Sequence, residues 1–320
     1  MDMKKKLLFV FNPRSGKAQI KNQLLDIVDT MVKADYEVTI YPTQCAGDAK
    51  EKVEAYAGNY DLVVCSGGDG TLDEVVTGMM KRKEQIPIGY IPTGTTNDFA
   101  RSLHIPKDML KAADTAVNGI VFPCDIGKFN HDFFVYIAAF GLFTDVSYQT
   151  KQEVKNVLGH LAYVLEGMKR LYNVPSYRIK VTHDDQVIED EFIFGMVTNS
   201  RSIGGFRNMV GKSIVFDDGE FEVTLIKTPK NPLALQEIIA AILIEQIDTK
   251  HMYTFKANSL KLESLEEIPW TLDGEFGGEH DEVMIENQRQ KLKIMVPIDK
   301  VKSLMKEPDT LQLEEGIEED

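Results

Sequence analysis

The sequence has 320 residues, of which 43% are hydrophobic and 27% are charged, so it is long enough for two domains with hydrophobic cores. Its net charge of -14 argues against a nucleic-acid-binding protein and against non-specific adhesion to anionic lipid. The three cysteines form no CxxC pair, which argues against a disulfide or zinc framework, and no stretch approaches the roughly 20 apolar residues of a membrane span, so we expect a cytoplasmic protein.

The first 128 residues alternate between predicted strands and predicted helices. Apolar runs typical of strands occur at residues 7–11, 37–41, 62–64 and 86–91, and a fifth strand ends in the sequence CDIG at residues 124–127. Strands that are apolar on both faces and alternate with amphipathic helices are typical of a parallel sheet covered on both sides. We therefore predict a three-layer α/β domain with a parallel sheet over residues 1–128.

From about residue 129 the apolar pattern changes to the two-residue alternation of antiparallel strands, interrupted by predicted helices at residues 152–172 and around 232–245. This pattern predicts a mainly antiparallel β-sandwich over residues 129–305, with the chain free to return to the first domain after about residue 296. Residues 306–320 hold seven carboxylates and no basic residue from Glu307 onward, so we expect a disordered acidic tail. The alternating segments are residues 177–181, 192–197, 222–226, 255–262, 268–272, 283–286 and 292–296.

A glycine-rich turn follows the apolar run at residues 62–64, with the sequence GGDGTLDE at residues 67–74. Glycines in a strand-to-helix turn let several backbone N–H groups point inward, which makes an anion site. Asp69 is unexpected there, because two like charges about 4 Å apart repel by about 4 kcal/mol at an effective dielectric constant of 20. An aspartate beside phosphate therefore indicates a bridging Mg²⁺ with a nucleoside triphosphate. For the glycines alone, an ordinary strand-to-helix turn is an alternative.

Two further polar turns follow predicted strands, NPRSGK at residues 12–17 and PTGTTNDFA at residues 92–100. Because ligands bind at the carboxyl ends of the strands in open parallel sheets, we expect these three turns, with the polar turn at Thr43, to lie along one edge. Neither the P-loop pattern nor GxGxxG is present, so the chain is not a P-loop enzyme or a Rossmann dehydrogenase by signature.

Two carboxylate-rich turns lie in the second half, FDDGEF at residues 216–221 and LDGE at residues 272–275. Carboxylates and carbonyls clustered around a glycine bend suit a hard cation. Each Asp-Gly pair, taken alone, also fits an ordinary hairpin turn.

The ordered set of these turns, together with DIGK at residues 125–128, resembles the diacylglycerol kinase catalytic-domain family of lipid kinases and, more distantly, NAD kinases. The resemblance implies an NAD kinase-like first domain and a metal in the second domain, held by the Asp218 side chain with the carbonyls of Val215 and Glu220. It implies a general base at Glu275, in a catalytic set with Asp69 and Asp273. The implied nucleotide contacts are Asn12, Pro13, Arg14, Ser15, Gly16, Thr43, Gly68, Asp69, Gly70, Thr71, Leu72, Asp73, Glu74 and Thr95.

On this resemblance we expect ATP-dependent phosphorylation of a hydroxyl group on a diacylglycerol-like lipid at the membrane surface, with the protein peripheral to the membrane. The glycine turns would hold the ATP phosphates, and Mg²⁺ would be held partly through Asp69, with Asp125 and waters as further candidates. Glu275 would take the proton from the acceptor hydroxyl. A kinase for a soluble acceptor such as NAD and a non-catalytic nucleotide-binding regulator are the alternatives, and a homodimer is left open.

The acceptor is the least determined part of the site. The predicted helix at residues 152–172 carries an apolar stripe with basic residues nearby, which fits either the edge of a lipid cleft or a face packed on a core. Glu166 stands where some family members have lysine, and Asp73 stands where the family commonly has asparagine. Both departures add negative charge, so the identity of the lipid is left open.

Overall fold

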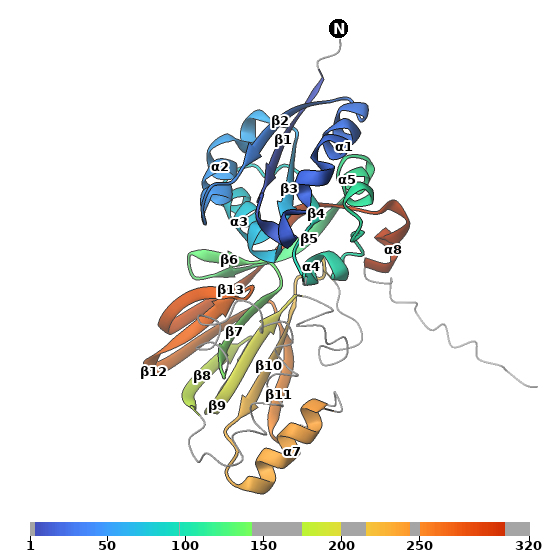
Figure 1. The fold of residues 1–320 in the computed structure, drawn as a ribbon. Coiled ribbons are helices and arrows are strands. Elements are labelled where there is room, and N and C mark those ends of the chain that lie inside the picture. Colours follow the sequence, from blue (N-terminus) through green and yellow to red (C-terminus); the bar gives the residue numbers. More distant parts are fainter. Residues whose placement is uncertain (1–3, 96, 143–174, 200–215, 244–249, 305–320) are drawn as a thin grey trace, which may run out of the picture.

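The structure, a computed structural model, describes residues 4–95, 97–142, 175–199, 216–243 and 250–304. The predicted helix at residues 152–172, with Glu166, and the predicted acidic tail lie outside these residues. The chain forms two lobes joined end to end, an α/β lobe and a β-rich lobe (Figure 1). None of the helices in the described ranges is both long and apolar enough to cross a membrane.

The first lobe is built on four strands that pair in parallel, in the order β2-β1-β3-β4. Every residue of β3 and β4 is buried because helices cover both faces of the sheet: α1 and α5 pack together on one side, and α2 and α3 on the other (Figure 1). The strands are β1 (Lys5–Phe11), β2 (Tyr36–Pro42), β3 (Leu62–Gly67) and β4 (Ile88–Pro92). The helices are η1 (Ser15–Ala18), α1 (Ile20–Lys33), α2 (Asp48–Tyr56), η2 (Ala57–Asn59), α3 (Asp69–Met80), α4 (Asp98–Ser102) and α5 (Met109–Asn118).

The prediction of a parallel sheet needs correction, because the sheet is mixed. The fifth strand, β5 (Ile120–Phe129), is antiparallel to β13 (Glu275–Val296), whose C-terminal end pairs in parallel with β4 through Ile294 and Ile88. The neighbour of β5 thus comes from the other end of the chain. A local apolar run cannot reveal the direction of such a distant partner.

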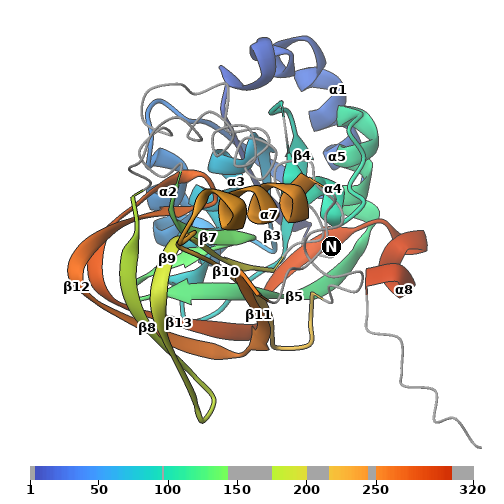
Figure 2. The same cartoon turned by 90° about the horizontal axis from the view of Figure 1, so that it is seen from below.

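The second lobe is an antiparallel sheet that curves round a core of its own (Figure 2). Trp270 lies at the centre of this core, with ring centroids 5.0 Å from Phe129 and 4.9 Å from Phe140. Alternating apolar residues supply the buried face, as predicted for a sandwich. The strands are β6 (Asp132–Phe134), β7 (Ile137–Gly141), β8 (Tyr177–His183), β9 (Gln186–Thr198), β10 (Phe221–Lys227), β11 (Met252–Ala257) and β12 (Ser259–Leu272), and α7 (Pro232–Leu243) packs nearby.

The 22-residue strand β13 connects the two lobes. Its first half pairs with β12, and its last residues enter the first sheet between β4 and β5 from Leu292 onward, earlier than the expected return after about residue 296. A short C-terminal segment, η4 (Ile298–Lys300) and α8 (Val301–Leu304), follows on the first lobe (Figure 1). The relative position of the lobes is therefore set by a continuous hydrogen-bonded strand.

Close packing of α5 on β4 gives a test of the first lobe. A Cβ atom on Gly89 would lie 2.6 Å from the Cβ of Ala116 and 3.1 Å from Val64 Cγ2. We expect Gly89→Ala to lower the free energy of unfolding by about 1–3 kcal/mol through overpacking, as measured by urea denaturation.

The control is a double-mutant cycle with Ala116→Gly, which opens the space at a helix-propensity penalty of about 1 kcal/mol. The double variant should recover part of the loss caused by Gly89→Ala. Wild-type stability of Gly89→Ala alone would show that β4 and α5 separate without penalty.

Candidate active site

The three polar turns predicted to share an edge do meet at the carboxyl ends of β1, β3 and β4. The Asn12 amide donates to the Ser66 carbonyl over 2.9 Å, and the Thr93 amide donates to the Gly67 carbonyl over 2.8 Å. These bonds continue the sheet beyond its strands and hold the turns after β1 and β4 against the turn after β3.

Glycine is needed where these turns touch. Gly16 has a φ of +55°, and a Cβ on it would lie 1.7 Å from the Thr93 carbonyl oxygen. A Cβ on Gly94 would lie 2.7 Å from the Gly68 Cα. No other residue could bring the three backbones this close, so the glycines serve the convergence of the turns as well as any ligand.

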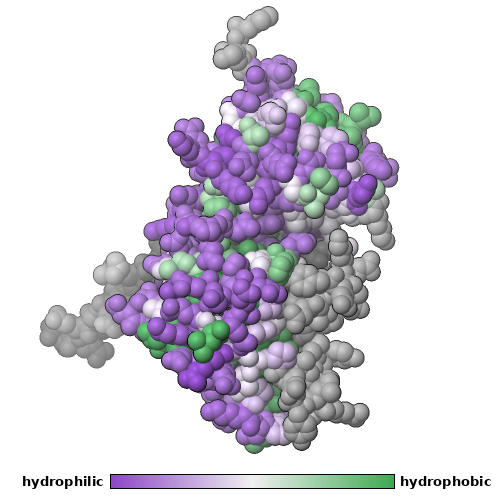
Figure 3. Space-filling view, turned by 90° about the vertical axis from the view of Figure 1, so that its left-hand side faces the viewer, coloured by the Kyte–Doolittle hydropathy of each residue, from purple (hydrophilic) through white to green (hydrophobic). Residues whose placement is uncertain are grey.

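A cavity of about 600 Å³ opens beside the turns and is lined by residues from both lobes. The lining of the cavity includes the turn between β2 and α2. The side of the molecule that carries α2 and β6 is covered mainly by hydrophilic residues (Figure 3). The predicted residues that line it are Asn12, Arg14, Thr43, Gly68, Gly70, Thr71, Asp73, Glu74 and Glu275. The lining residues that were not predicted are Gln44, Cys45, Ala46, Gly47, Lys50, Thr77 and Asp132.

Some of the lining residues that were not predicted could have been recognised from the sequence, whereas Asp132 could not. The segment ending in Gly47 follows a predicted strand, so it belongs to the same sheet edge as the other turns. Lys50, in the first turn of α2, could have been found on the same ground. Asp132 begins the three-residue strand β6, which is too short for a periodic pattern.

Glu74 holds the start of α2 in place. Its two carboxylate oxygens accept from the amides of Gly47 and Ala49, at 2.9 and 3.1 Å. The first N–H groups of a helix have no partner within the helix, so a carboxylate there satisfies them and is favoured by the helix dipole. The carboxylate of Glu74 therefore shapes the cavity wall that Gly47 lines.

Asp69 joins two of the turns and retains one unused oxygen. Its Oδ2 accepts from the Asn97 amide over 2.9 Å, whereas its Oδ1 is buried without a hydrogen-bond partner among the described residues. Burial raises the pKa of the Asp69 carboxyl, and the backbone amides of Asn97, Phe99 and Asp98 oppose that shift. A buried carboxylate oxygen of this kind is a position for a hard cation or its water.

Asp73 lies one helical turn after Asp69 on α3 and also has a buried carboxylate oxygen. Its Oδ1 is also buried without a hydrogen-bond partner in the described part of the chain, and burial together with the nearby Asp273 carboxylate raises the pKa of Asp73 well above its usual range. The described ranges contain no group of three or more His, Cys, Asp or Glu residues arranged for a metal. Two carboxylates still fit Mg²⁺, which commonly takes one or two of them and completes its shell with phosphate oxygens and waters.

Asp273 shapes the turn that presents Glu275. Its carboxylate accepts from three consecutive backbone amides, Val135 at 2.5 Å and Tyr136 and Ile137 at 2.9 Å each. Burial raises the pKa of Asp273 to about 7, while the three amide donors favour its ionised form. With both oxygens bonded, Asp273 fixes the β12–β13 turn to the start of β7.

Glu275 is two residues further along this turn, exposed at the cavity wall. A Cβ built on Gly70 would lie 3.4 Å from Glu275 Oε1, so this carboxylate of the second lobe faces the glycine turn of the first. Two predicted groups from different lobes are therefore brought together.

Other predicted residues lie beside the cavity or elsewhere. Pro13, Ser15 and Gly16 belong to the first turn without lining the cavity, and Leu72 is 1% exposed in the core. Thr95 lines a separate cavity of about 290 Å³ with Gln19, Lys107 and other residues.

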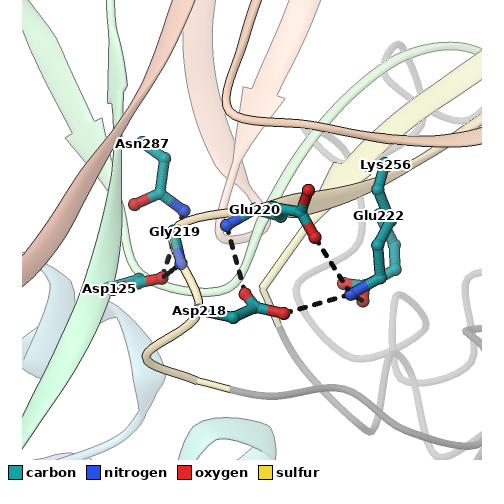
Figure 4. A network of polar contacts seen from close by, with 7 residues as sticks. All are labelled: Asp125, Asp218, Gly219, Glu220, Glu222, Lys256 and Asn287. Atoms are coloured by element: carbon teal, nitrogen blue, oxygen red, sulfur yellow. Dashed lines mark hydrogen bonds and ion pairs between the residues drawn. The ribbon is translucent and has the colours of Figure 1, made fainter.

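The loop predicted to hold a metal in the second lobe already contains a cation (Figure 4). Asp218 accepts from the Glu220 amide and from the Lys256 ammonium, each over 3.1 Å. Val215, the third predicted ligand, lies outside the described residues. As it stands, the loop is therefore occupied by a lysine.

Asp125, a candidate for the nucleotide-side metal, belongs to this loop instead. Its carboxylate accepts from the amides of Gly219 and Gln290, at 2.6 and 2.7 Å. It is absent from the lining of the large cavity.

Comparison with known proteins agrees with both lobes. The diacylglycerol kinase catalytic domain matches residues 6–129, and the YegS C-terminal NAD kinase beta sandwich-like domain matches residues 139–296. A protein of Bacillus subtilis named diacylglycerol kinase is 37% identical over 276 residues, which cover 86% of this chain and 91% of that protein. The chain belongs to the diacylglycerol kinase family.

Other members of the diacylglycerol kinase family give the same picture. A Staphylococcus carnosus protein of that name is 36% identical over 300 residues, covering 93% of this chain and 97% of its own. A crystal structure from Bacillus anthracis strain Sterne, solved as a candidate diacylglycerol kinase, superposes with a TM-score of 0.79 at 28% identity, covering 92% of this chain and 96% of that one. The two-lobe arrangement is thus the arrangement of this family.

The three amide bonds of Asp273 can be tested by Asp273→Asn. The amide NH₂ of asparagine would replace one acceptor oxygen opposite a backbone N–H group, so we expect a loss of about 1–3 kcal/mol in the free energy of unfolding, measured in urea.

Asp184→Asn is the matched control, since Asp184 is also an aspartate with positive φ in a turn, and its side chain is 60% exposed. It should change stability by less than about 0.5 kcal/mol. Equal losses in the two variants would show that the bonds of Asp273 add no stability.

Proposed function

We propose that this chain is an ATP-dependent lipid kinase that phosphorylates a hydroxyl group of a diacylglycerol-like lipid by direct phosphoryl transfer. The observation that carries the proposal is the position of Glu275 opposite the Gly68–Gly70 turn, because it puts a potential base beside a potential phosphate site. The names of the relatives in Bacillus subtilis and Staphylococcus carnosus support the choice of lipid.

For the nucleotide, the support comes from the turns of the first lobe. The N-terminus of α3 follows Gly68 directly, and helix N-termini favour anions. Arg14 and Lys50 add positive charge to the cavity lining. We propose that the predicted residues lining the cavity contact ATP, that Pro13, Ser15 and Gly16 shape the first turn, and that Thr95 belongs to the outer edge of the site.

Mg²⁺ is proposed at Asp69 and Asp73. Each has a buried oxygen with no hydrogen-bond partner in the described part of the chain, which fits Mg²⁺, and the bound ion would neutralise charge on the phosphates. Without a cation, the carboxylates of this cavity would repel a triphosphate. The protein's own contribution is to hold these oxygens on one face of α3.

The transfer step is assigned to groups of the chain itself. The acceptor hydroxyl oxygen attacks the γ-phosphorus of ATP, the bond from that phosphorus to the bridging oxygen breaks, and ADP leaves. Glu275 accepts the hydroxyl proton, a role that generally contributes about 10²- to 10⁴-fold. Asp273 is a positioning residue, because its carboxylate is bonded to backbone amides and its place in the turn determines where Glu275 lies.

We propose a nucleotide-binding unit at residues 1–128 and an acceptor-binding unit at residues 129–305, acting at the cytoplasmic face of a membrane. The function is tested by incubating the protein with labelled ATP, Mg²⁺, vesicles containing diacylglycerol or other lipids, and NAD, and separating the products. Label in lipid is the expected result. Label in NAD would indicate a soluble acceptor, and label in neither would indicate a nucleotide-binding regulator.

Glu275→Gln removes the base and keeps the shape of the side chain. We expect turnover to fall by about 10²- to 10⁴-fold, with ATP affinity measured by calorimetry nearly unchanged. Glu279→Gln, on the same strand and outside the cavity lining, is the control and should keep full turnover. Near-normal turnover of Glu275→Gln would place the base elsewhere.

Asp69→Asn keeps an oxygen that can accept from the Asn97 amide but removes the charge. We expect the Mg²⁺ concentration needed for half-maximal turnover to rise about tenfold or more, since about 1.4 kcal/mol of lost attraction corresponds to a factor of ten.

Asp108→Asn is the control, because Asp108 also accepts from a backbone amide at a helix N-terminus, that of Lys111. Its Mg²⁺ titration should match the wild type. An unchanged titration for Asp69→Asn would exclude Asp69 from the cation site.

A further inference from the structure

Lys256 is surrounded by carboxylates in the loop of the second lobe (Figure 4). Its ammonium lies 3.1 Å from Asp218 Oδ2, 3.6 Å from Glu220 Oε2 and 3.5 Å from Glu222 Oε1. Three acidic side chains thus converge on one basic side chain.

The pairing of β10 with β11 places Lys256 among these carboxylates. β10 and β11 are antiparallel, and Glu222 is directly opposite Lys256 in their register. Directly opposed side chains of an antiparallel pair lie close enough to interact. Glu220, two residues before Glu222, joins the same group, while Phe221 between them is buried in the core of the lobe.

Lys256 does not neutralise the group completely. Three carboxylates and one ammonium leave a net negative charge in a partly buried position, where the Asp218 side chain is 7% exposed and burial raises the pKa of Glu222 to about 7. Glu222 Oε2 is also buried without a hydrogen-bond partner among the described residues. Buried carboxylates require compensation, and oxygen ligands of this kind suit a hard divalent cation.

A divalent cation bound to Asp218 would lie next to the ammonium that already contacts the same oxygen. Two positive charges this close together repel each other, and the repulsion is stronger in a partly buried position than in water. We propose that Lys256 is a built-in counterion of the Asp218 loop, and that a divalent metal binds there only by displacing it.

The surroundings permit this exchange. The Lys256 side chain is 41% exposed, and its flexible stem can carry the ammonium into solvent. Another cavity, of about 590 Å³, is lined by Asp218, Gly219 and Glu220 and gives a cation access to the loop.

Replacement of the Lys256 ammonium by a metal at the loop would affect the contacts between the lobes. The Gly219 amide donates to Asp125 on β5, which also accepts from Gln290 on β13. Thermal stability therefore reports on the occupancy of the loop, and it does so without reference to turnover or to the kinase assignment.

The test compares the full chain with Lys256→Met, without nucleotide. Mn²⁺ affinity is measured by calorimetry, and the midpoint of thermal unfolding is measured with and without Mg²⁺ or Mn²⁺. We expect Lys256→Met to unfold at a lower temperature without metal, to recover when metal is added, and to bind Mn²⁺ about tenfold or more tightly than the wild type. Lys256→Arg, which keeps the charge, should bind Mn²⁺ as weakly as the wild type.

Lys261→Met is the matched control, because Lys261 also lies between two carboxylates, Glu263 at 3.0 Å and Glu282 at 3.2 Å. It should produce no gain in metal affinity. Adding Asp218→Asn to Lys256→Met should abolish the gain and so assign it to this loop. Equal Mn²⁺ affinity in the wild type and Lys256→Met would overturn the proposal.

If Lys256→Met does not fold, a crystal of the wild type soaked in Mn²⁺ tests the exchange of Lys256 for a metal. Mn²⁺ at Asp218 with Lys256 turned into solvent, or no Mn²⁺ with Lys256 still paired, agrees with the exchange. Mn²⁺ at Asp218 beside a lysine that keeps its bond to the same carboxylate would contradict it.

Discussion

The candidate site depends on the buried contact between the Asp273 carboxylate and three consecutive backbone amides at residues 135–137. This contact ties the β12–β13 turn to the start of β7. β13 itself continues into the sheet of the first lobe, so the turn is fixed with respect to the glycine turns as well. Glu275 can therefore face Gly70 from a different lobe without any direct bond between them. The bonded carboxylate of Asp273 fixes the shape of the turn, and the exposed carboxylate of Glu275 is left available to accept a proton.

The structure compensates its partly buried carboxylates in two different ways. Asp73, in the cavity lining, and Asp69, one helical turn before it, each keep an oxygen without a hydrogen-bond partner among the described residues, which suits a cation that arrives with phosphate. At the Asp218 loop, the compensating charge is the chain's own Lys256. The difference follows from strand register, because β11 places a lysine opposite Glu222, whereas Asp69 and Asp73 lie on a helix beside an open cavity. Similar clusters of acidic residues in a sequence can thus have different occupants.

Features of the fold that depend on a local pattern could be predicted from the sequence, whereas those that depend on a distant partner could not. Glycines at 67, 68 and 70 after an apolar run predicted a turn at the sheet edge, and the structure has that turn. The prediction that β5 belongs to a parallel sheet was wrong, because its direction is set by pairing with β13 from the far end of the chain. The family resemblance implied that Thr95 contacts the nucleotide, and the structure places Thr95 in the lining of another cavity. Asp132 gave no signal, since β6 is only three residues long.

The sequence by itself determined the alternation of strands and helices, the change to an antiparallel lobe, the glycine turns and the acidic residues within them. These features depend on local properties: side-chain periodicity and the backbone freedom of glycine. Only the tertiary structure decided that Glu275 faces Gly70, that Asp273 is bonded to the amides of residues 135–137, and that Lys256 occupies the Asp218 loop. Each of these contacts joins residues far apart in the chain, and their distances are fixed by strand register and packing, which no local pattern encodes.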